Sequence, residues 1–266
     1  SRAVMTTSYA KILAGAEAIA AEAAAALTRM QRSALNVSRK SLRDVVTAAD
    51  LESEAIVLRG IRELTPDAAI LSEEAGASGA DQRTRWIVDP LDGTVNYAAG
   101  LPWFSVTLAY QENGVTRVGV THAPAANVIA RYVDGGVATV NDRAAAVSDR
   151  DSLADAVVSI VLTSHFTDAE VARTSDAVRR LGRSVRGVRI IVSGGLEMTL
   201  VADGQLDAFV SLKADAVSHA AAMPLVRAAG GRVTRLDGRD ATDDDVERIA
   251  SNGRIHDALL HCLAGV

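Results

Sequence analysis

Three short apolar runs, joined by brief connections, constrain the fold more than any other feature of this 266-residue chain. Connections this short cannot hold the crossover that a parallel pair requires, so we expect neighbouring strands of one antiparallel sheet. Glycines in the intervening turns agree with this expectation. The runs are Phe104 to Gln111, Thr116 to His122 and Asn127 to Val133, with turn glycines at Gly114, Gly135 and Gly136.

The segments on either side of this sheet predict further elements. Before it, periodicity predicts helices over Thr7 to Met30 and Leu51 to Leu64, then strands near Ala68 to Ser72 and Arg85 to Val88. After it, strands and helices alternate, which predicts a mixed sheet with covering helices. These later elements are Val157 to Thr163, Asp168 to Leu181, Val188 to Val192, Leu196 to Ala202, Leu206 to Leu212, His219 to Ala229, Arg232 to Leu236 and Ile255 to Leu263.

A polar stretch without a clear period, Ser148 to Asp155, separates the two patterns. We therefore expect two parts. Residues 1–147 would form N-terminal helices plus an antiparallel sheet, and residues 148–266 a mixed α/β half.

Charge and cysteine content narrow the functional classes. The formal net charge is -5 and the basic residues are scattered, so the chain has no basic footprint for nucleic acid. Cys262 is the only cysteine, which excludes an intrachain disulfide and favours the cytoplasm. The Ala-rich stretch Ile12 to Leu27 is interrupted by Glu17 and Glu22, so we expect an amphipathic helix and no membrane association.

The run from Trp86 to Tyr97 places two carboxylates, Asp89 and Asp92, at the end of an apolar strand. Pro90 cannot donate to a strand ladder, so the chain is expected to turn there. Two carboxylates three residues apart, together with a turn carbonyl such as that of Leu91, suit Mg²⁺.

Gly93 and Thr94 complete this run. Gly93 would let the backbone approach a ligand closely, and a helix beginning at Thr94 would direct free N–H groups at a phosphate. Taken alone, an Asp-Pro-x-Asp-Gly string is more often an ordinary turn, because these are the standard turn residues.

Acidic residues in two earlier segments support the interpretation of Asp89 and Asp92 as part of a metal site. Glu73 and Glu74 follow the short strand Ala68 to Ser72, and adjacent acids after a buried strand are costly unless a cation receives them. Glu74 is interpreted as a surface acid. Asp50 precedes the helix Leu51 to Leu64, where its simplest role is that of an N-cap.

Together these segments resemble the inositol monophosphatase family of Mg²⁺-dependent, Li⁺-sensitive phosphatases. The family pattern is an acid pair, then Asp-Pro-x-Asp-Gly-Thr-x-Asn-aromatic, then Trp-Asp-x-Ala-Ala. The similarity covers nearly the whole chain and includes the stretches 100–106, 204–209 and 229–234. It implies an α+β fold, a layered αβαβα sandwich of the inositol monophosphatase and sugar phosphatase type, and a homodimer.

The third motif departs from the family pattern. The expected Trp-Asp falls on Val217 and Ser218, and a family Glu that contacts substrate hydroxyls falls on Ser211. A hydroxyl can still hold a metal or its water but lacks the carboxylate charge. Asp215 could stand in for the missing acid. His219 is the other possibility, although it more often packs or hydrogen-bonds at such a position, and imidazole matches Mg²⁺ poorly.

The resemblance implies hydrolysis of a small phosphate monoester by a metal-activated water. Glu73 and Asp89, with the Leu91 carbonyl, would hold one Mg²⁺. Asp89 and Asp92 would reach toward a second, weaker one, where Ser218 replaces the expected aspartate ligand. Thr94, oriented by Asp50, would relay the water's proton. The amides of Gly93 and Thr94 would hold the phosphate, and the other residues expected to face substrate are Ser193, Gly194, Ser211 and Asp215.

Ser211 also bears on the substrate, because it removes an acceptor for the hydroxyls of a polyol. Inositol monophosphate is therefore not favoured, and a sugar, other cyclitol, nucleoside or biosynthetic-intermediate phosphate fits equally well. Ser218 keeps two alternatives open. One is a catalytically weakened member that binds ligands or regulates, and the other is a phosphate-ligand enzyme of different reaction type.

Overall fold

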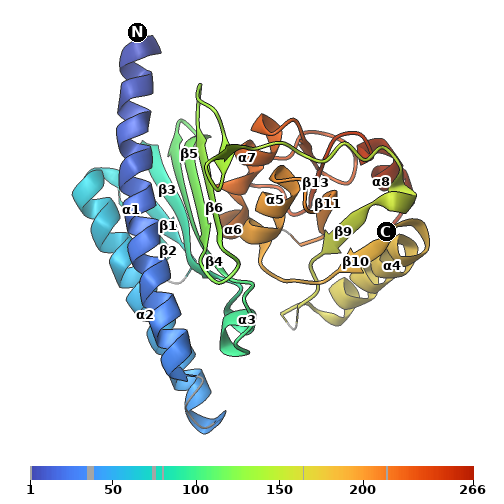
Figure 1. Ribbon diagram of the computed structural model, residues 1–266, viewed down its shortest axis with the longest axis horizontal. Coiled ribbons are helices and arrows are strands. Elements are labelled where there is room, and N and C mark those ends of the chain that lie inside the picture. The colour runs from blue at the N-terminus through green and yellow to red at the C-terminus, as the bar shows by residue number, and fades with distance from the viewer. Residues whose placement is uncertain (1, 35–38, 74–75, 80, 164, 214) are drawn as a thin grey trace.

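The computed structural model describes residues 2–34, 39–73, 76–79, 81–163, 165–213 and 215–266. Its elements form five layers: a helical pair, a sheet, a middle layer of helices, a second sheet and an outer layer of helices (Figure 1). This arrangement confirms the predicted layered α+β sandwich.

The first layer consists of two long helices lying side by side, α1 (Arg2–Ala34) and α2 (Arg39–Leu64) (Figure 1). They approach closely because each contributes a glycine to the contact: Gly15 lies against Leu64, and Gly60 lies against Ile19. Within the described residues, neither these nor the other helices have the length and apolar character needed to cross a membrane.

Helix α2 begins earlier than predicted. Because it already starts at Arg39, Asp50 lies in its interior, and the N-cap role expected for Asp50 is wrong. The segment before Asp50 continues the helix instead of forming a separate element.

The first sheet has the strand order β2-β1-β3-β4-β5-β6-β7-β8. Strands β3 to β6 pair antiparallel, as predicted, whereas β1 runs parallel to β3. The strands are β1 (Ala68–Ser72), β2 (Gly76–Ser78), β3 (Asp81–Asp92), β4 (Ser105–Glu112), β5 (Val115–Ala123), β6 (Val128–Val133), β7 (Thr139–Val140) and β8 (Arg143–Ala144).

Strand β3 runs past Pro90, so the turn expected there is wrong. The pairing of β3 with β4 shifts register between Asp89 and Asp92, and Pro90 lies in this irregularity. Such a position suits proline, which cannot donate to the ladder. The Ser53 hydroxyl of α2 donates to the Pro90 carbonyl at 2.7 Å and thereby satisfies it.

The second sheet is mixed, as predicted, with strand order β10-β9-β11-β13-β12. Strand β9 pairs parallel with β10 and β11, while β13 pairs antiparallel with β11 and β12. Strand β13 was not predicted. The strands are β9 (Val157–Ile160), β10 (Gly187–Arg189), β11 (Ala208–Ser211), β12 (Arg232–Thr234) and β13 (Arg248–Ser251).

Helices cover both faces of this second sheet (Figure 1). Between the sheets lie α5 (Gly194–Ala202), α6 (Ala216–His219) and α7 (Ala222–Ala228), and the outer layer holds α4 (Asp168–Ser184) and α8 (His256–Cys262). The single helix expected over His219 to Ala229 is divided into α6 and α7. The boundary between residues 147 and 148 stays a prediction.

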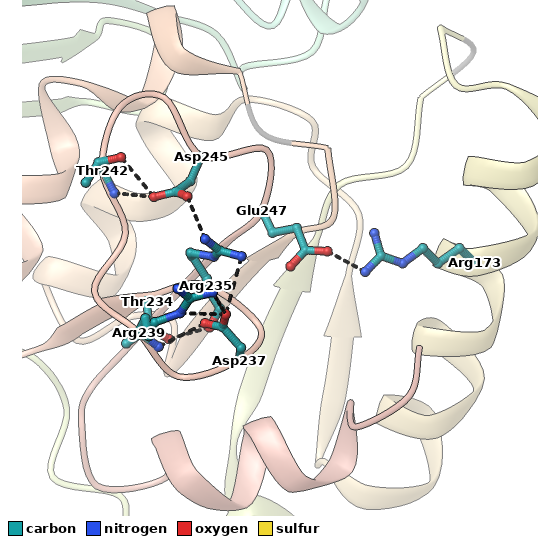
Figure 2. A network of polar contacts seen from close by, with 8 residues as sticks. All are labelled: Arg173, Thr234, Arg235, Asp237, Arg239, Thr242, Asp245 and Glu247. Carbon is teal, nitrogen blue, oxygen red and sulfur yellow. Dashed lines mark hydrogen bonds and ion pairs between the residues drawn. The ribbon is translucent and has the colours of Figure 1, made fainter.

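Polar contacts hold the segment that joins β12 to β13 (Figure 2). Asp237 pairs with two arginines of this segment, and Glu247 pairs with Arg173 of α4. Such partly exposed pairs contribute little individually. They nevertheless fix the segment just before β13, whose first residue, Arg248, is fully buried. The side chains drawn in Figure 2 are Arg173, Thr234, Arg235, Asp237, Arg239, Thr242, Asp245 and Glu247.

Helix α5 is buried on nearly all sides because sheets cover it from both directions, and it carries a buried acid, Glu197. The Glu197 carboxyl accepts a hydrogen bond from the Ser193 N–H at 2.9 Å. Burial raises the pKa of Glu197 to about 8, and the charge of Asp92 adds to this effect. Glu197 therefore carries a proton at neutral pH.

Replacing Gly119 by alanine is expected to destabilise the protein. An added Cβ on Gly119 of β5 would lie 2.7 Å from the Ala221 carbonyl oxygen, and backbone cannot rotate away. Gly119→Ala should lower the free energy of unfolding in urea by about 1–3 kcal/mol. Gly182 of α4 is the matched position, because a Cβ there would have no described atom beyond the helix backbone within 4 Å. Gly182→Ala should raise the free energy of unfolding by roughly 0.5–1 kcal/mol. Unaltered stability in Gly119→Ala would contradict this close contact between the layers.

Because of Glu197, the free energy of unfolding should decrease as the pH rises. The stabilising effect of Glu197 is fully present below the ordinary pKa of 4.5 and is lost as the pH approaches about 8, because only the unfolded chain releases the proton in this window. The loss amounts to roughly 1.4 kcal/mol per pH unit. Glu197→Gln should therefore gain stability relative to the parent between pH 5 and pH 7.5 in urea denaturation. Glu63→Gln, at an exposed position, serves as the control, and parallel pH profiles for parent and Glu197→Gln would refute the assignment.

Candidate active site

A cavity of about 380 Å³ opens where the end of β3 faces α5, α6 and the loops that follow β9 and β11. Glu73, which follows β1, shares this cavity with Asp89 and Asp92 of β3. Asp50 and Ser193 do not line it, and Glu74 lies outside the described residues. The predicted site residues that line it are Glu73, Asp89, Leu91, Asp92, Gly93, Thr94, Gly194, Ser211, Asp215 and Ser218.

Asp89 is a buried acid that hydrogen bonds hold in place. One carboxylate oxygen accepts from the Leu91 N–H at 3.0 Å, and the other accepts from the Ser218 hydroxyl at 2.7 Å. Burial, reinforced by the charges of Asp92 and Glu73, raises the pKa of Asp89 well above its ordinary value. A cation in the cavity would stabilise the charged form of this carboxylate.

Three carboxylates converge beside Asp89. Among the described residues, one ligand atom from each of Glu73, Asp89 and Asp215 lies within 4.8 Å of the other two. Glu73 is exposed, Asp89 is buried and Asp215 is half-buried. Oxygen donors of this kind suit a hard divalent cation. The structure thus brings Asp215 next to Glu73 and Asp89.

Both oxygens of the Asp92 carboxylate accept hydrogen bonds from other groups of the protein. Its Oδ2 atom accepts from the Ser105 and Ser193 hydroxyls at 2.9 and 2.7 Å and from the Gly195 N–H at 3.0 Å. Its Oδ1 atom accepts from the Gly194 N–H at 3.2 Å. Asp92 therefore joins the end of β3 to the first turn of α5. Its role as a metal ligand stays a prediction, as does a substrate role for the buried Ser193.

The turn after β3 leads directly into α3 (Thr94–Ala98), at the predicted start. Gly93 has φ +88, and a Cβ there would lie 2.6 Å from the Trp103 carbonyl oxygen, so only glycine fits. The Thr94 hydroxyl donates to the Leu91 carbonyl at 3.1 Å. Asp50 lies close enough for its charge, after burial, to help raise the pKa of Tyr97 to about 12. The predicted orientation of Thr94 by Asp50 remains a prediction.

The wall formed by β11 and the loop after it carries Ser211 where the family pattern predicts an acid, and a positively charged side chain, Lys213, two residues later. The Ser211 hydroxyl donates to the Lys213 carbonyl at 2.9 Å. The Lys213 ammonium pairs with Glu170 at 3.1 Å and lies 5.7 Å from the ring centroid of Phe166. This side of the cavity therefore combines an apolar ring with a paired positive charge.

Sequence reasoning missed Arg248, which supports the site from β13. Its guanidinium donates to the Asp215 carbonyl and to the His219 Nδ1 atom, both at 3.0 Å. His219 must accept here, because arginine has only donors. Burial and the Arg248 charge hold the pKa of His219 well below its ordinary value, so the ring is neutral. Its ring also packs edge-on against Phe209, which agrees with the packing role predicted for His219.

Comparisons with known proteins agree with this geometry. The model of the inositol monophosphatase family matches residues 8–265. The chain is 36% identical over 226 residues, 85% of each chain, to a fructose-1,6-bisphosphatase/inositol-1-monophosphatase of Thermotoga maritima. It is 33% identical over 233 residues, 87% of this chain and 86% of the relative, to the Nus factor SuhB of Pasteurella multocida.

Solved structures show the same similarity. An inositol monophosphatase from Anabaena (Nostoc) superposes with a TM-score of 0.84 at 32% identity, covering 96% of each chain. The suppressor protein SuhB of Bartonella henselae gives a TM-score of 0.86 at 28% identity, covering 96% of this chain and 99% of that one. Since the family model matches almost the whole chain and the relatives match most of it, this chain belongs to the inositol monophosphatase family of phosphoric monoester hydrolases.

Proposed function

We propose that this protein hydrolyses a small phosphate monoester with the help of Mg²⁺. The observation that carries the proposal is the convergence of Glu73, Asp89 and Asp215 in a cavity that the Gly93–Thr94 turn also lines. Such a donor set fits a hard divalent cation, and burial, together with the charges of Asp92 and Glu73, raises the pKa of Asp89. A bound Mg²⁺ would offset charge on the phosphoryl oxygens and lower the pKa of a coordinated water.

The chain's own residues supply the remaining functions. Glu73 and Asp89, together with the Leu91 carbonyl, would hold the cation. The backbone amides of Gly93 and Thr94, at the first turn of α3, would bind the phosphate. Asp92 would keep α5 against the end of β3 and so preserve the shape of the cavity.

Thr94 would handle the proton of the attacking water. Its hydroxyl hydrogen is donated to the Leu91 carbonyl, so the lone pairs of its oxygen are available to accept a hydrogen bond from a water in the cavity. As Thr94 takes up a proton from the water, its own hydroxyl hydrogen would turn from the Leu91 carbonyl to the Asp50 carboxylate, which would receive it.

The substrate would be a phosphorylated sugar, cyclitol, nucleoside or biosynthetic intermediate. The absence of an acid at Ser211 and the presence of Lys213 disfavour inositol monophosphate as the substrate. We also propose that the protein acts in the cytoplasm as a homodimer. Relatives named Nus factor SuhB leave room for a regulatory role, and a net charge of -5 favours a small phosphorylated ligand over nucleic acid.

Phosphate release from a panel of sugar, cyclitol and nucleoside phosphates should require Mg²⁺. Asp89→Asn removes a buried carboxylate from the proposed cation site, so its rate should fall by about 100-fold or more. Asp151→Asn, which removes the same charge at an exposed position, should leave the rate unchanged. Turnover without any divalent metal, or none with any phosphate ester, would count against the proposal.

The proton relay is tested at Thr94. Thr94→Ala removes the hydroxyl and should lower kcat by about 100-fold, the usual contribution of a positioned proton carrier. Thr94→Ser keeps the hydroxyl and should retain most of the parental kcat. Equal losses in the two variants would show that the methyl group, and not the hydroxyl, is what matters.

A further inference from the structure

We propose that Asp215 is the third carboxylate ligand of the divalent-cation site and that Ser218 positions it. Asp215, three residues before Ser218, would thus supply the negative charge that the family pattern places at position 218. The inference rests on the proposed function, because that function supplies the reason for a cation at this place.

The first support is the position of the Asp215 carboxylate. It shares with Glu73 and Asp89 a cluster in which the ligand atoms lie within 4.8 Å of one another, although it belongs to a different layer of the fold. Like charges this close destabilise one another unless a cation or a proton lies between them.

The second support is that the Ser218 hydroxyl lies between two carboxylates but has only one hydrogen to donate. Its buried hydroxyl oxygen lies 2.7 Å from Asp89 Oδ2 and 2.9 Å from Asp215 Oδ2. A serine hydroxyl has one hydrogen, so it can donate to only one of these carboxylates at a time. The other carboxylate oxygen then faces a hydroxyl lone pair, and a cation coordinated by both acids removes this repulsion.

The third support is that backbone contacts fix the direction of Asp215. Its Oδ1 atom accepts from the Val217 N–H at 2.8 Å and caps α6, which leaves Oδ2 directed at Ser218. Arg248 donates to the backbone carbonyl of Asp215, and this bond anchors the loop without using the carboxylate. A carboxylate held in this way loses little conformational freedom on binding an ion.

Cation affinity tests the assignment directly. Mn²⁺ binding, measured by electron paramagnetic resonance and calorimetry, should weaken by about 10-fold or more in Asp215→Asn. Asparagine retains an oxygen that can cap α6, so the change removes charge but keeps the cap. Ser218→Ala, which removes the hydroxyl that lies between Asp89 and Asp215, should weaken binding by about 10-fold. Asp151→Asn should bind as the parent does.

A rescue variant separates charge from position. Ser218→Asp, introduced into Asp215→Asn, returns a carboxylate to the cavity and should recover most of the parental affinity. Thermal unfolding without metal serves as the control for folding. Because Asp215→Asn relieves repulsion, its metal-free Tm should equal or exceed that of the parent, while the Mg²⁺-induced rise in Tm should shrink.

The outcomes distinguish this inference from the proposed function. Parental Mn²⁺ affinity in Asp215→Asn, with affinity lost in Asp89→Asn, would overturn the role of Asp215 and leave the phosphatase proposal standing. Affinity lost in Asp215→Asn, in a parent that releases phosphate from no ester, would support the ligand assignment and overturn the proposed function. A parent that binds no Mn²⁺ would overturn both.

Discussion

Four donors converge on the carboxylate of Asp92, and the two halves of the cavity depend on this junction. The donors are two serine hydroxyls and the first two N–H groups of α5, and they come from both sides of the cavity. A buried carboxylate is stable only when its lone pairs are satisfied in this way. Asp92 thus acts first as a structural connector, and its position brings the end of β3 against the middle helical layer.

That junction also explains two consecutive glycines. A Cβ on Gly194 would lie 2.3 Å from His219 Nε2, and one on Gly195 would lie 2.5 Å from Thr107 Cγ2. Any larger residue would push α5 away from β4 or from α6. The backbone can reach Asp92 only because both positions lack side chains, so the acid and the glycines form one arrangement.

Most elements and the acidic run at the end of β3 could be predicted from the sequence, because both depend on local patterns. Asp89, Asp92 and Gly93 lie in one contiguous run, and β4 to β6 follow alternating apolar runs with short turns. Asp50 was misplaced because a polar residue before an apolar period resembles a helix start, whereas α2 already begins at Arg39. Strand β13 was missed because it is four residues long and begins with an arginine, which is buried against partners that include the distant Asp215 carbonyl. The place of Asp215 beside Asp89 depends on that same arginine and could not be derived from spacing.

Strand β13 determines when the second half can be completed during synthesis. It lies between β11 and β12 in the sheet, although both of those strands precede it along the chain. Until it leaves the ribosome, β11 and β12 have no shared partner, and the loop that holds Asp215 lacks the guanidinium of Arg248. The nascent chain can therefore build its first sheet early, while the acidic cavity is finished only after the chain has emerged past β13.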